Sequence, residues 1–392
     1  MRIGLITPGF SAGESDWCIP ALLDLVRELS SRHDVYVLTL RYPHQRRAYQ
    51  VFGAIVNSLG GATSGGFHRL PLLTRGLAAL RQAHRQAPFD VLHGLWADEP
   101  GFLAVSAGRL LGVPAVVSLL GGELVALPEI GYGGQLSRSN RWLAGQALRR
   151  AQAVTTGSEL LRVIAAPYVG RGQLTVQPLG VDTLLFCPAQ PDPVSESVLG
   201  LAGEFKLLHV ASLVPIKDQV TLLRSVALVA RQHPGVHLHV LGAGPLRAFL
   251  NTEAQELNLS EHVTFHGDVS HDRLPDFYRA ADLFVLSSRY ESQSLVVLEA
   301  AACGCPAVGT AVGILPELLP PEHLAPVGDP AALAAAVGRL LEQPQRLVDA
   351  GIAAYRLATS RYSLSQTAPG FEALYRTLAA SSSSDAEHPD DA

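Results

Sequence analysis

Short apolar runs alternate with longer stretches of mixed polarity along most of this chain. Apolar runs bounded by Gly, Pro, Asp or Ser indicate buried strands, and apolar residues repeated every three or four positions indicate helices. Ser158, which precedes Glu159, is expected to cap one of these helices. In the first half the pattern predicts strands at Ile3–Thr7, Val35–Leu40, Asp90–His93, Ala115–Leu119, Ala153–Thr155 and Leu174–Gln177, and helices near Ile19–Ser31, Arg75–Gln86, Pro100–Leu111, Arg141–Ala151 and Ser158–Ala166.

Two internal segments interrupt this alternation. Residues 41–73 include a Gly-rich run at 60–66 and predict a mobile loop, whereas residues 186–205 are rich in Pro and Ser and predict a linker. The polar, acidic segment 381–392 predicts disorder. After the linker a second series begins, with strands expected at Lys206–Ala211, Val236–Leu241, Val263–His266, Leu283–Leu286 and Ala307–Gly309, and later helices at Asp329–Glu342, Gln345–Tyr355 and Leu364–Leu378.

Two strand-and-helix series joined by a linker predict an α/β protein with two doubly wound, Rossmann-like domains facing across a cleft. The length of 392 residues agrees, because it exceeds what one ordinary core holds. We expect domains at 1–185 and 206–360 and a last helix at 361–380. A hydrophobic content of 48% and a charged content of 17% are typical of a soluble globular protein. No apolar run reaches the roughly 18 residues that span a bilayer.

The first residues and the cysteines favour a cytoplasmic protein. The segment Ile3–Thr7 and the following Pro8-Gly9 indicate a strand and a turn, not a signal peptide. The four cysteines have neither disulfide nor metal-site spacing, so a reducing compartment is the simplest context. They are Cys18, Cys187, Cys303 and Cys305.

The net charge of −5 is unevenly distributed. Residues 1–183 hold 17 Arg, no Lys and 12 acidic residues (+5), which leaves 13 basic and 23 acidic residues (−10) for the remainder. The basic half suits an anionic membrane or a phosphorylated ligand, although ordinary solvated arginines are the favoured explanation. Aromatic residues make up 6% of the chain, and no basic run alternates with them, which argues against nucleic acid. Arg41, Arg46 and Arg47, near Tyr42 and Tyr49, leave a lipid-linked acceptor open.

Two glutamates, Glu291 and Glu299, are candidates for a binding site. Glu291 follows an apolar strand, and Glu299 lies eight residues further on, within an expected helix from Ser294 to Ala302. At about 100° per residue the two side chains need not stack, yet both can face the carboxyl end of the strand. Ligands of open α/β sheets bind at that end.

The segment Gly242-Ala243-Gly244-Pro245 lies between a strand and a helix. Glycines allow close approach of the backbone to a ligand, proline suits a first helical turn, and a helix N-terminus favours anions. Arg247 occupies the place of the third glycine of a dinucleotide fingerprint, which disfavours a dehydrogenase. A purely structural tight turn explains the same glycines.

Lys217 follows another expected strand end. The chain has only two lysines, Lys206 and Lys217, among 30 basic residues. An ammonium at such a turn can neutralise a diphosphate leaving group. Surface solubility is the alternative explanation.

An ordered set of short motifs resembles the retaining glycosyltransferases of family 4, the group 1 type with the GT-B fold. The matches cover nearly all of residues 175–345, with weaker ones at Asp90–His93 and Gly157-Ser158. The ordered set comprises Gln177–Asp182 with Phe186 and Pro188, Leu213–Lys217, Gly242–Pro245, Phe265–Gly267, Tyr278, Ala281-Asp282, Glu291–Glu299, Ala302–Pro306, Gly313 and Pro316-Glu317.

The resemblance implies roles for particular residues. Lys217 would bind the diphosphate, Glu291 would hold the donor sugar, and Glu299 would accept from the ribose hydroxyls. The last helix would return to the first, acceptor-binding domain, and the second domain would bind the nucleotide sugar. Further contacts with donor would come from Ser294, Leu295, Gly242, Gly244, Pro245, Gly267, Val269 and, from the first domain, Gly13. No Asp-x-Asp motif ends a strand, which fits the family's usual independence of metals; no cofactor is expected.

Two departures from the family pattern stand out. Ala211-Ser212 replaces the usual Gly-Arg, so Ser212 supplies only a hydroxyl and Arg247 is a candidate to compensate. The segment 120–123 replaces the usual His-Gly, which rules out a histidine there and leaves Gly122 and Glu123 as candidates for the acceptor pocket. His93, at a strand end, is more simply a packed residue than a catalyst.

The resemblance implies transfer of a hexosyl group from a UDP- or GDP-sugar to an acceptor hydroxyl with retention, in glycolipid, polysaccharide or glycoconjugate synthesis. The leaving phosphate would help to deprotonate the acceptor, so positioning and charge stabilisation would supply most of the catalysis. An epimerase of the same fold and a non-catalytic nucleotide-sugar-binding protein remain alternatives. The basic first domain leaves peripheral association with the inner membrane face open.

Overall fold

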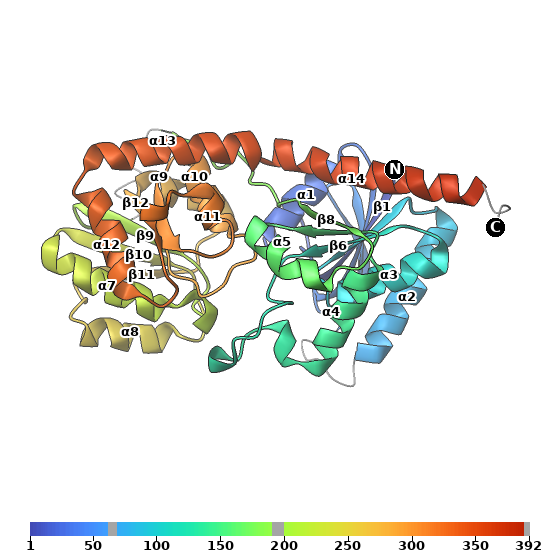
Figure 1. Cartoon of the computed structure of the whole chain (residues 1–392), viewed down its shortest axis with the longest axis horizontal. Helices are drawn as coiled ribbons and strands as arrows, with labels where there is room; N and C mark the ends of the chain where they lie inside the picture. The colour runs from blue at the N-terminus through green and yellow to red at the C-terminus, as the bar shows by residue number, and fades with distance from the viewer. Residues whose placement is uncertain (62–68, 190–199, 388–392) are drawn as a thin grey trace. The chain divides into compact units, whose positions relative to one another are not determined.

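The computed structural model describes residues 1–61, 69–189 and 200–387. The chain forms two compact units, Met1–Gly180 with Leu364–Ala392, and Val181–Ser363. Each unit is built around a largely parallel sheet with helices packed on it (Figure 1). The two-series α/β prediction is therefore confirmed at the level of fold class.

The first unit contains an eight-stranded sheet in the order β3-β4-β2-β1-β5-β6-β7-β8. All neighbouring strands are parallel except β3 and β4. The central strands are buried on both faces, which explains their continuous apolar runs. The strands are β1 (Arg2–Gly9), β2 (Asp34–Tyr42), β3 (Arg47–Val51), β4 (Ala54–Ser58), β5 (Val91–Leu95), β6 (Ala115–Leu119), β7 (Ala153–Thr156) and β8 (Gln173–Val176). The helices are α1 (Pro20–Ser30), α2 (Arg69–Gln86), α3 (Glu99–Leu111), α4 (Arg138–Arg150), α5 (Glu159–Ala165) and α14 (Leu364–Glu387).

The hairpin β3–β4 corrects the prediction of a loop over residues 41–73. Its strands pair antiparallel from Arg47 opposite Ser58 to Val51 opposite Ala54. Phe52 and Gly53 connect them with φ angles of 47° and 82°. Positive φ at both loop residues is the geometry of the two-residue hairpin turn that matches strand twist. The predicted Gly-rich loop at 62–68 lies outside the described residues.

The second unit contains a six-stranded parallel sheet in the order β11-β10-β9-β12-β13-β14. The chain runs outward from β9 through β10 to β11, and then crosses to β12 on the other side of β9. The carboxyl ends of β9 and β12 therefore form the switch point at which such sheets bind ligands. The strands are β9 (Phe205–Val210), β10 (Val236–Leu241), β11 (Val263–Gly267), β12 (Leu283–Leu286), β13 (Ala307–Thr310) and β14 (Leu324–Ala325). The helices are α7 (Gln219–Gln232), α8 (Arg247–Glu256), α9 (Leu274–Ala280), α10 (Leu295–Ala302), α11 (Leu315–Leu318), α12 (Pro330–Leu341) and α13 (Pro344–Arg361).

The unit boundaries differ in detail from the sequence-based ones. Phe186, placed in the linker, is 1% exposed and belongs to the core of the second unit, where its ring packs on Tyr278. Residues 190–199 of the expected linker lie outside the described residues. The segment expected to be disordered from Ser381 continues α14 as far as Glu387.

Helix α14 packs on the sheet of the first unit. Both ring nitrogens of His93 on β5 form hydrogen bonds, Nδ1 with the Tyr375 hydroxyl and Nε2 with the Ser118 hydroxyl, each at 2.7 Å. Burial lowers the pKa of His93 to about 3, so the ring is neutral. The interpretation of His93 as a packed residue is confirmed.

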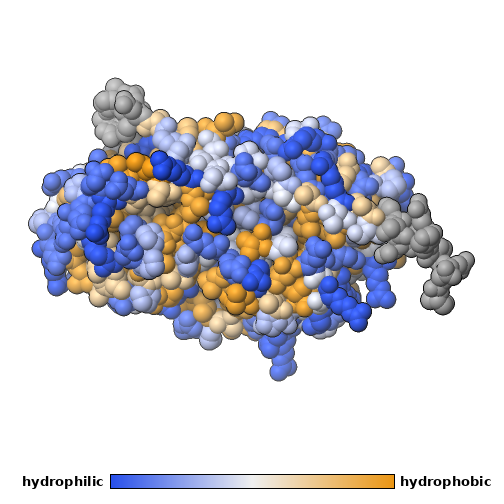
Figure 2. Space-filling view, turned by 45° about the horizontal axis from the view of Figure 1, so that its top comes forward, coloured by the Kyte–Doolittle hydropathy of each residue, from blue (hydrophilic) through white to orange (hydrophobic). Residues whose placement is uncertain are grey.

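Exposed apolar residues are distributed over many elements, and on the face drawn in Figure 2 hydrophobic residues are mixed with hydrophilic ones. Across residues 1–61, 69–189 and 200–387, no helix combines the length and the hydropathy needed to cross a membrane.

Candidate active site

An ion pair between Lys217 and Glu291 lies at the switch point of the second sheet. Lys217 ends a short 3₁₀ turn, η5 (Pro215–Lys217), after β9, and Glu291 lies in the loop after β12. Lys217 Nζ is 2.5 Å from Glu291 Oε1, and the Ser288 hydroxyl donates to the same oxygen at 2.7 Å. The side chains remain 23% and 12% exposed. A bound anion can therefore reach the ammonium without a rearrangement of the core.

The two loops that carry this pair are tied to each other by hydrogen bonds. Arg289 N donates to Ile216 O at 2.8 Å, and the Ser287 hydroxyl donates to Lys217 O at 2.8 Å. Arg289 also reaches Asp218, which adopts a left-handed conformation with φ of 48°. These bonds fix the position of Lys217 relative to Glu291.

Ser294 stands at the N-terminus of α10 in a strained conformation. Its φ of 84° and ψ of 70° are unusual for a residue with a Cβ, and such strain costs of the order of 1–3 kcal/mol. Its hydroxyl is buried and has no hydrogen-bond partner among the described residues. Leu295 begins the helix, and the first amides of any helix lack intrahelical acceptors. The turn therefore offers a hydroxyl and helix-terminal N–H groups to a ligand.

Gly313 keeps this turn accessible. A Cβ at Gly313 would lie 2.9 Å from the Glu291 Cβ and 3.0 Å from the Ser294 hydroxyl oxygen, and the residue has φ of 56°. Both the space and the backbone angle therefore require glycine beside the candidate site.

Glu299 lies within α10 and is held by two aromatic side chains. The Tyr278 hydroxyl donates to Oε2 at 2.9 Å, and His271 Nε2 lies 3.3 Å from Oε1. Burial, together with the charge of Glu299, raises the pKa of Tyr278 well above its usual value, so the phenol stays protonated as a donor. Phe186 packs edge-on against His271. This cage fixes the carboxylate of Glu299 while each oxygen retains capacity for a further donor.

The glycines of the 242–245 turn are required by neighbouring loops. A Cβ at Gly242 would lie 2.1 Å from Ala211 O, and one at Gly244 would lie 2.5 Å from Leu213 O. Leu213 N donates to Ala243 O at 2.9 Å, so the loops after β9 and β10 are joined. The structural explanation of these glycines is therefore sufficient.

The other predicted residues of this edge are placed as follows. Gly267 has φ of 80° and accepts a 2.7 Å hydrogen bond from Gly242 N, while Val269 is half-buried against the core. Ser212 is exposed, and its carbonyl accepts from Gln219 at 3.0 Å. Pro245 lies in the turn before α8 and not in its first helical turn, because the helix begins at Arg247.

The side chain of Arg247 is not placed to replace the absent phosphate-binding arginine. Its guanidinium stacks on the Phe265 ring at 4.6 Å and donates to Phe265 O at 3.0 Å. Both contacts hold the side chain against β11. Arg247 therefore does not compensate for Ser212 in this conformation.

Three predicted residues belong to the first unit. Gly13 lies in the loop after β1, where no atom lies within 4 Å of a Cβ added to it. A Cβ at Gly122 would lie 2.6 Å from the Tyr132 ring, so packing explains that glycine. The Glu123 carboxylate is 5% exposed and accepts from the amides of Gly121, Leu120 and Ala97 at 2.8, 3.2 and 3.3 Å.

The environment of Glu123 alters its acidity. Burial raises its pKa to about 7, and the charge of Asp98 acts in the same direction, while the backbone N–H donors oppose the rise. By accepting from Ala97 after β5 and from Leu120 and Gly121 after β6, the buried carboxyl group links these two loops. The sequence suggested that Glu123 lines an acceptor pocket, whereas the structure places its side chain in a buried position.

Sequence reasoning did not identify Ser288 and His271, which contact Glu291 and Glu299. Ser287-Ser288 directly after the apolar strand β12 was the available signal for the first. His271 had none, because it lies 28 positions before Glu299, with a helix and a strand between them. Within residues 1–61, 69–189 and 200–387, no cluster of three His, Cys, Asp or Glu side chains is arranged to hold a metal ion.

The architecture matches solved glycosyltransferases of the GT-B class. A sucrose-phosphate synthase from Thermosynechococcus elongatus is similar over 97% of this chain and 100% of its own, with a TM-score of 0.78 and 22% identity. The Anabaena protein HepE in complex with UDP and glucose is similar over 96% and 100%, with a TM-score of 0.75 and 21% identity. The fold is therefore GT-B.

Sequence comparison places the chain more narrowly. The family described as glycosyl transferases group 1 matches residues 195–357, and the glycosyl transferase 4-like domain matches residues 19–180. A D-inositol 3-phosphate glycosyltransferase 2 from Catenulispora acidiphila is 33% identical over 330 residues, which are 78% of this chain and 75% of that protein. The chain belongs to the glycosyl transferases group 1 family.

Other relatives match over shorter regions. A D-inositol 3-phosphate glycosyltransferase from Mycolicibacterium gilvum is 30% identical over 63% of this chain and 57% of its own length. A GDP-mannose-dependent alpha-(1-6)-phosphatidylinositol monomannoside mannosyltransferase from Mycolicibacterium smegmatis is 32% identical over 57% of this chain. The match covers 62% of that second protein, so the chain spans about six tenths of both relatives.

Proposed function

We propose that this protein transfers a hexosyl group from a nucleoside diphosphate sugar to an acceptor hydroxyl, with retention of the anomeric configuration. The observation that carries the proposal is the Lys217–Glu291 pair at the switch point, 2.5 Å apart and accessible to solvent. A nearby ammonium and a carboxylate suit the two ends of such a donor, because the diphosphate is anionic and the sugar is a hydrogen-bond donor. Membership of the family supports the same reaction class.

The proposed chemistry depends on positioning. Lys217 would exchange Glu291 for the diphosphate as charge develops on the leaving group, and Glu291 would then accept from the sugar hydroxyls. The strained Ser294 turn would add its hydroxyl and helix-terminal amides. Glu299, held by Tyr278, would accept from the ribose hydroxyls. None of these roles requires a metal ion, and we propose metal-independent transfer.

The names of relatives and neighbours guide the choice of substrates. One relative is described as GDP-mannose-dependent, and HepE was solved with UDP and glucose, so UDP- and GDP-sugars are the donors to test. Several relatives are D-inositol 3-phosphate glycosyltransferases, and another uses a phosphatidylinositol mannoside. A phosphorylated polyol, free or lipid-linked, is accordingly the first acceptor class to test. A lipid-linked acceptor would bring the protein to a membrane surface.

Calorimetric titration with UDP, GDP and ADP tests the donor site. We expect one of them to bind and the Lys217→Gln and Glu299→Gln variants to bind it more weakly. Failure of all three to bind the wild-type protein would contradict the proposal.

Incubation with the donor alone separates transfer from epimerisation, since an epimerase would convert the sugar without any acceptor. Donor binding without turnover on any acceptor would favour a non-catalytic role.

A further inference from the structure

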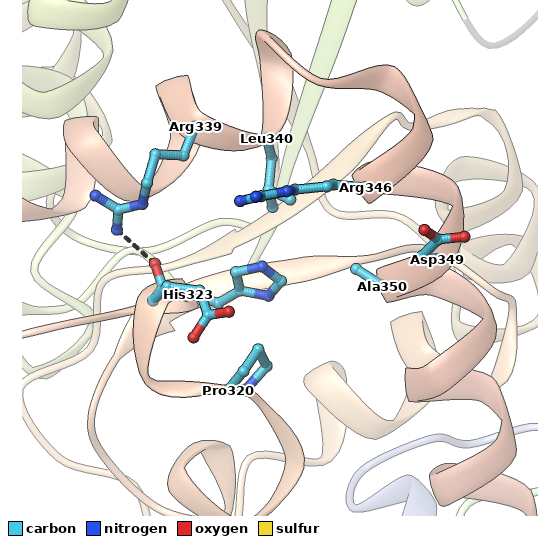
Figure 3. Close-up of a pocket in the computed structure, with 8 residues that line it drawn as sticks. Pro320, His323, Arg339, Leu340, Arg346, Asp349 and Ala350 are labelled. Atoms are coloured by element: carbon cyan, nitrogen blue, oxygen red, sulfur yellow. Dashed lines mark hydrogen bonds between the residues drawn. The ribbon is translucent and has the colours of Figure 1, made fainter.

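A second polar pocket lies in the second unit, between η7 (Pro321–His323), the end of α12 and the start of α13 (Figure 3). Its volume is about 270 Å³. The turn η7 precedes β14, so the pocket lies at the amino-terminal edge of the parallel sheet. The Lys217–Glu291 pair lies at the carboxyl-terminal edge. The pocket is therefore separate from the candidate active site.

Two arginines face each other across this pocket. Arg339 comes from the last turn of α12 and donates to Glu322 O, whereas Arg346 comes from the first turn of α13. In Figure 3 the guanidinium of Arg346 extends over His323 toward Arg339. Among the described residues, no hydrogen bond or ion pair of the Arg346 side chain is found. Both arginines are exposed, so solvent screens their mutual repulsion, and an anion bound between them would lower it further.

The position of Arg346 in its helix strengthens this argument. A cation suits the last turn of a helix, so the helix dipole explains Arg339. The same dipole disfavours Arg346 in the first turn of α13, a helix of 18 residues with no acidic side chain in that turn. Neither the helix nor an ion pair thus accounts for Arg346, whereas an anion would satisfy both the arginine and the helix N-terminus.

His323 adds a buried donor. It is 8% exposed, and its Nδ1 has no hydrogen-bond partner among the described residues. Burial lowers the pKa of His323, and the charges of Arg339 and Arg346 lower it further against the opposing Glu322. The arginine charges therefore act on the ring, which is neutral near pH 7 and keeps one N–H to donate.

Two carboxylates limit what the pocket can hold. Glu322, next to His323 in the chain, lines the pocket. Asp349, which accepts from Gln345 at 3.0 Å, lies on the side of the pocket away from Arg339 (Figure 3). With two arginines and two acids the lining has no formal excess charge. It suits one small oxyanion between the arginines better than a polyphosphate.

We propose that this pocket binds a phosphate group, either free phosphate or the terminal phosphate of a small phosphomonoester. Arg339 and Arg346 hold its oxygens, and the His323 imidazole donates from below. The site stands independently of the glycosyl transfer proposed above, because it involves other residues at the other edge of the sheet.

Titration with inorganic phosphate and with glycerol 3-phosphate, at ionic strength matched with chloride, tests the site. We expect saturable binding to the wild-type protein. The Arg339→Gln, Arg346→Gln double variant should bind about 100-fold more weakly, at about tenfold for each charged contact. Arg356→Gln is the matched control, because Arg356 is also exposed on α13 but does not line the pocket, and it should bind as the wild type does.

The Lys217→Gln variant shows whether the measured binding occurs at the candidate donor site, because it weakens phosphate binding there. If Lys217→Gln abolishes binding and the double arginine variant does not, or if the wild-type protein binds neither probe, the proposal is overturned. Equal affinities for the two probes would indicate free phosphate as the ligand. Tighter binding of glycerol 3-phosphate would indicate a phosphorylated metabolite. A failure here leaves nucleoside diphosphate binding intact, and the reverse also holds.

Discussion

The phenol of Tyr278 donates a 2.9 Å hydrogen bond to Oε2 of Glu299 inside the second unit. Tyr278 is fully buried, and its ring contacts Phe186 and Phe284, so the donor comes from the core and not from the surface. The carboxylate of Glu299 is consequently oriented before any ligand arrives. Preorganisation of this kind reduces the ordering cost of binding.

Tyr278→Phe tests this orientation. The change removes a hydrogen bond to a charged group, so we expect the free energy of unfolding to fall by about 1.5–3 kcal/mol. Nucleoside diphosphate affinity should fall as well, because Glu299 would lose its fixed position. Urea denaturation and calorimetry measure the two effects. Unchanged nucleotide affinity in a folded Tyr278→Phe protein would disconnect this hydrogen bond from donor binding.

Lys217→Gln should lower turnover by roughly 10²–10³-fold if its charge acts chiefly on the leaving diphosphate. Lys206→Gln is the natural control, because Lys206 is the only other lysine and lies within β9. Steady-state kinetics with the identified donor measures both. Equal losses in the two variants would show that the effect is not specific to the switch point.

Substitutions at Ser294 separate strain from chemistry. Ser294→Gly should raise the free energy of unfolding by about 1 kcal/mol, because glycine adopts φ of 84° without a steric penalty. Ser294→Ala keeps the strain and removes only the hydroxyl. Both variants should bind donor more weakly than the wild type if the hydroxyl contacts it. Wild-type donor affinity in both would assign the hydroxyl no part in binding.

The raised pKa of Glu123 predicts that the stability of the fold depends on pH. Its pKa is raised to about 7 in the folded protein from an ordinary value near 4.5, so the folded state binds the proton more tightly than the unfolded state does. The contribution of Glu123 to the free energy of unfolding is thus fully present below about pH 4.5. It is lost as the pH rises through about 7, at up to about 1.4 kcal/mol per pH unit.

The Glu123→Gln variant isolates that contribution. The free energy of unfolding of the wild type should fall relative to that of Glu123→Gln as the pH rises from 5 to 8, because only the wild type loses stability through this group. Titrating groups that do not interact with Glu123, His93 included, contribute equally to both proteins. Parallel curves would contradict the raised pKa.

The sequence predicted the second sheet more closely than the first. The bounds of β10 and β12 agree with the predicted runs 236–241 and 283–286, since strands buried on both faces leave an unbroken apolar signal. The hairpin β3–β4 lies at a sheet edge, where Arg47, Ala48 and Gln50 of β3 are exposed, which weakens that signal.

The candidate site was predicted as separate residues and not as contacts. Spacing indicated that Lys217 and Glu291 each follow a strand, but only the crossing from β11 to β12 places β12 directly beside β9. The orientation of Arg247 depends on Phe265, a residue of the next strand, so local sequence could not assign it. Hydrogen bonds such as Tyr278 to Glu299 likewise depend on packing between α9 and α10.

The docking of α14 on β5 has a consequence for the order of assembly during protein synthesis. Every residue of the second unit leaves the ribosome before α14 does, yet α14 supplies the Tyr375 partner of His93 and completes the packing of the first unit. The unit that is translated first is therefore finished last. Until then, the face of its sheet that receives Phe371 and Tyr375 is exposed to water and to chaperones.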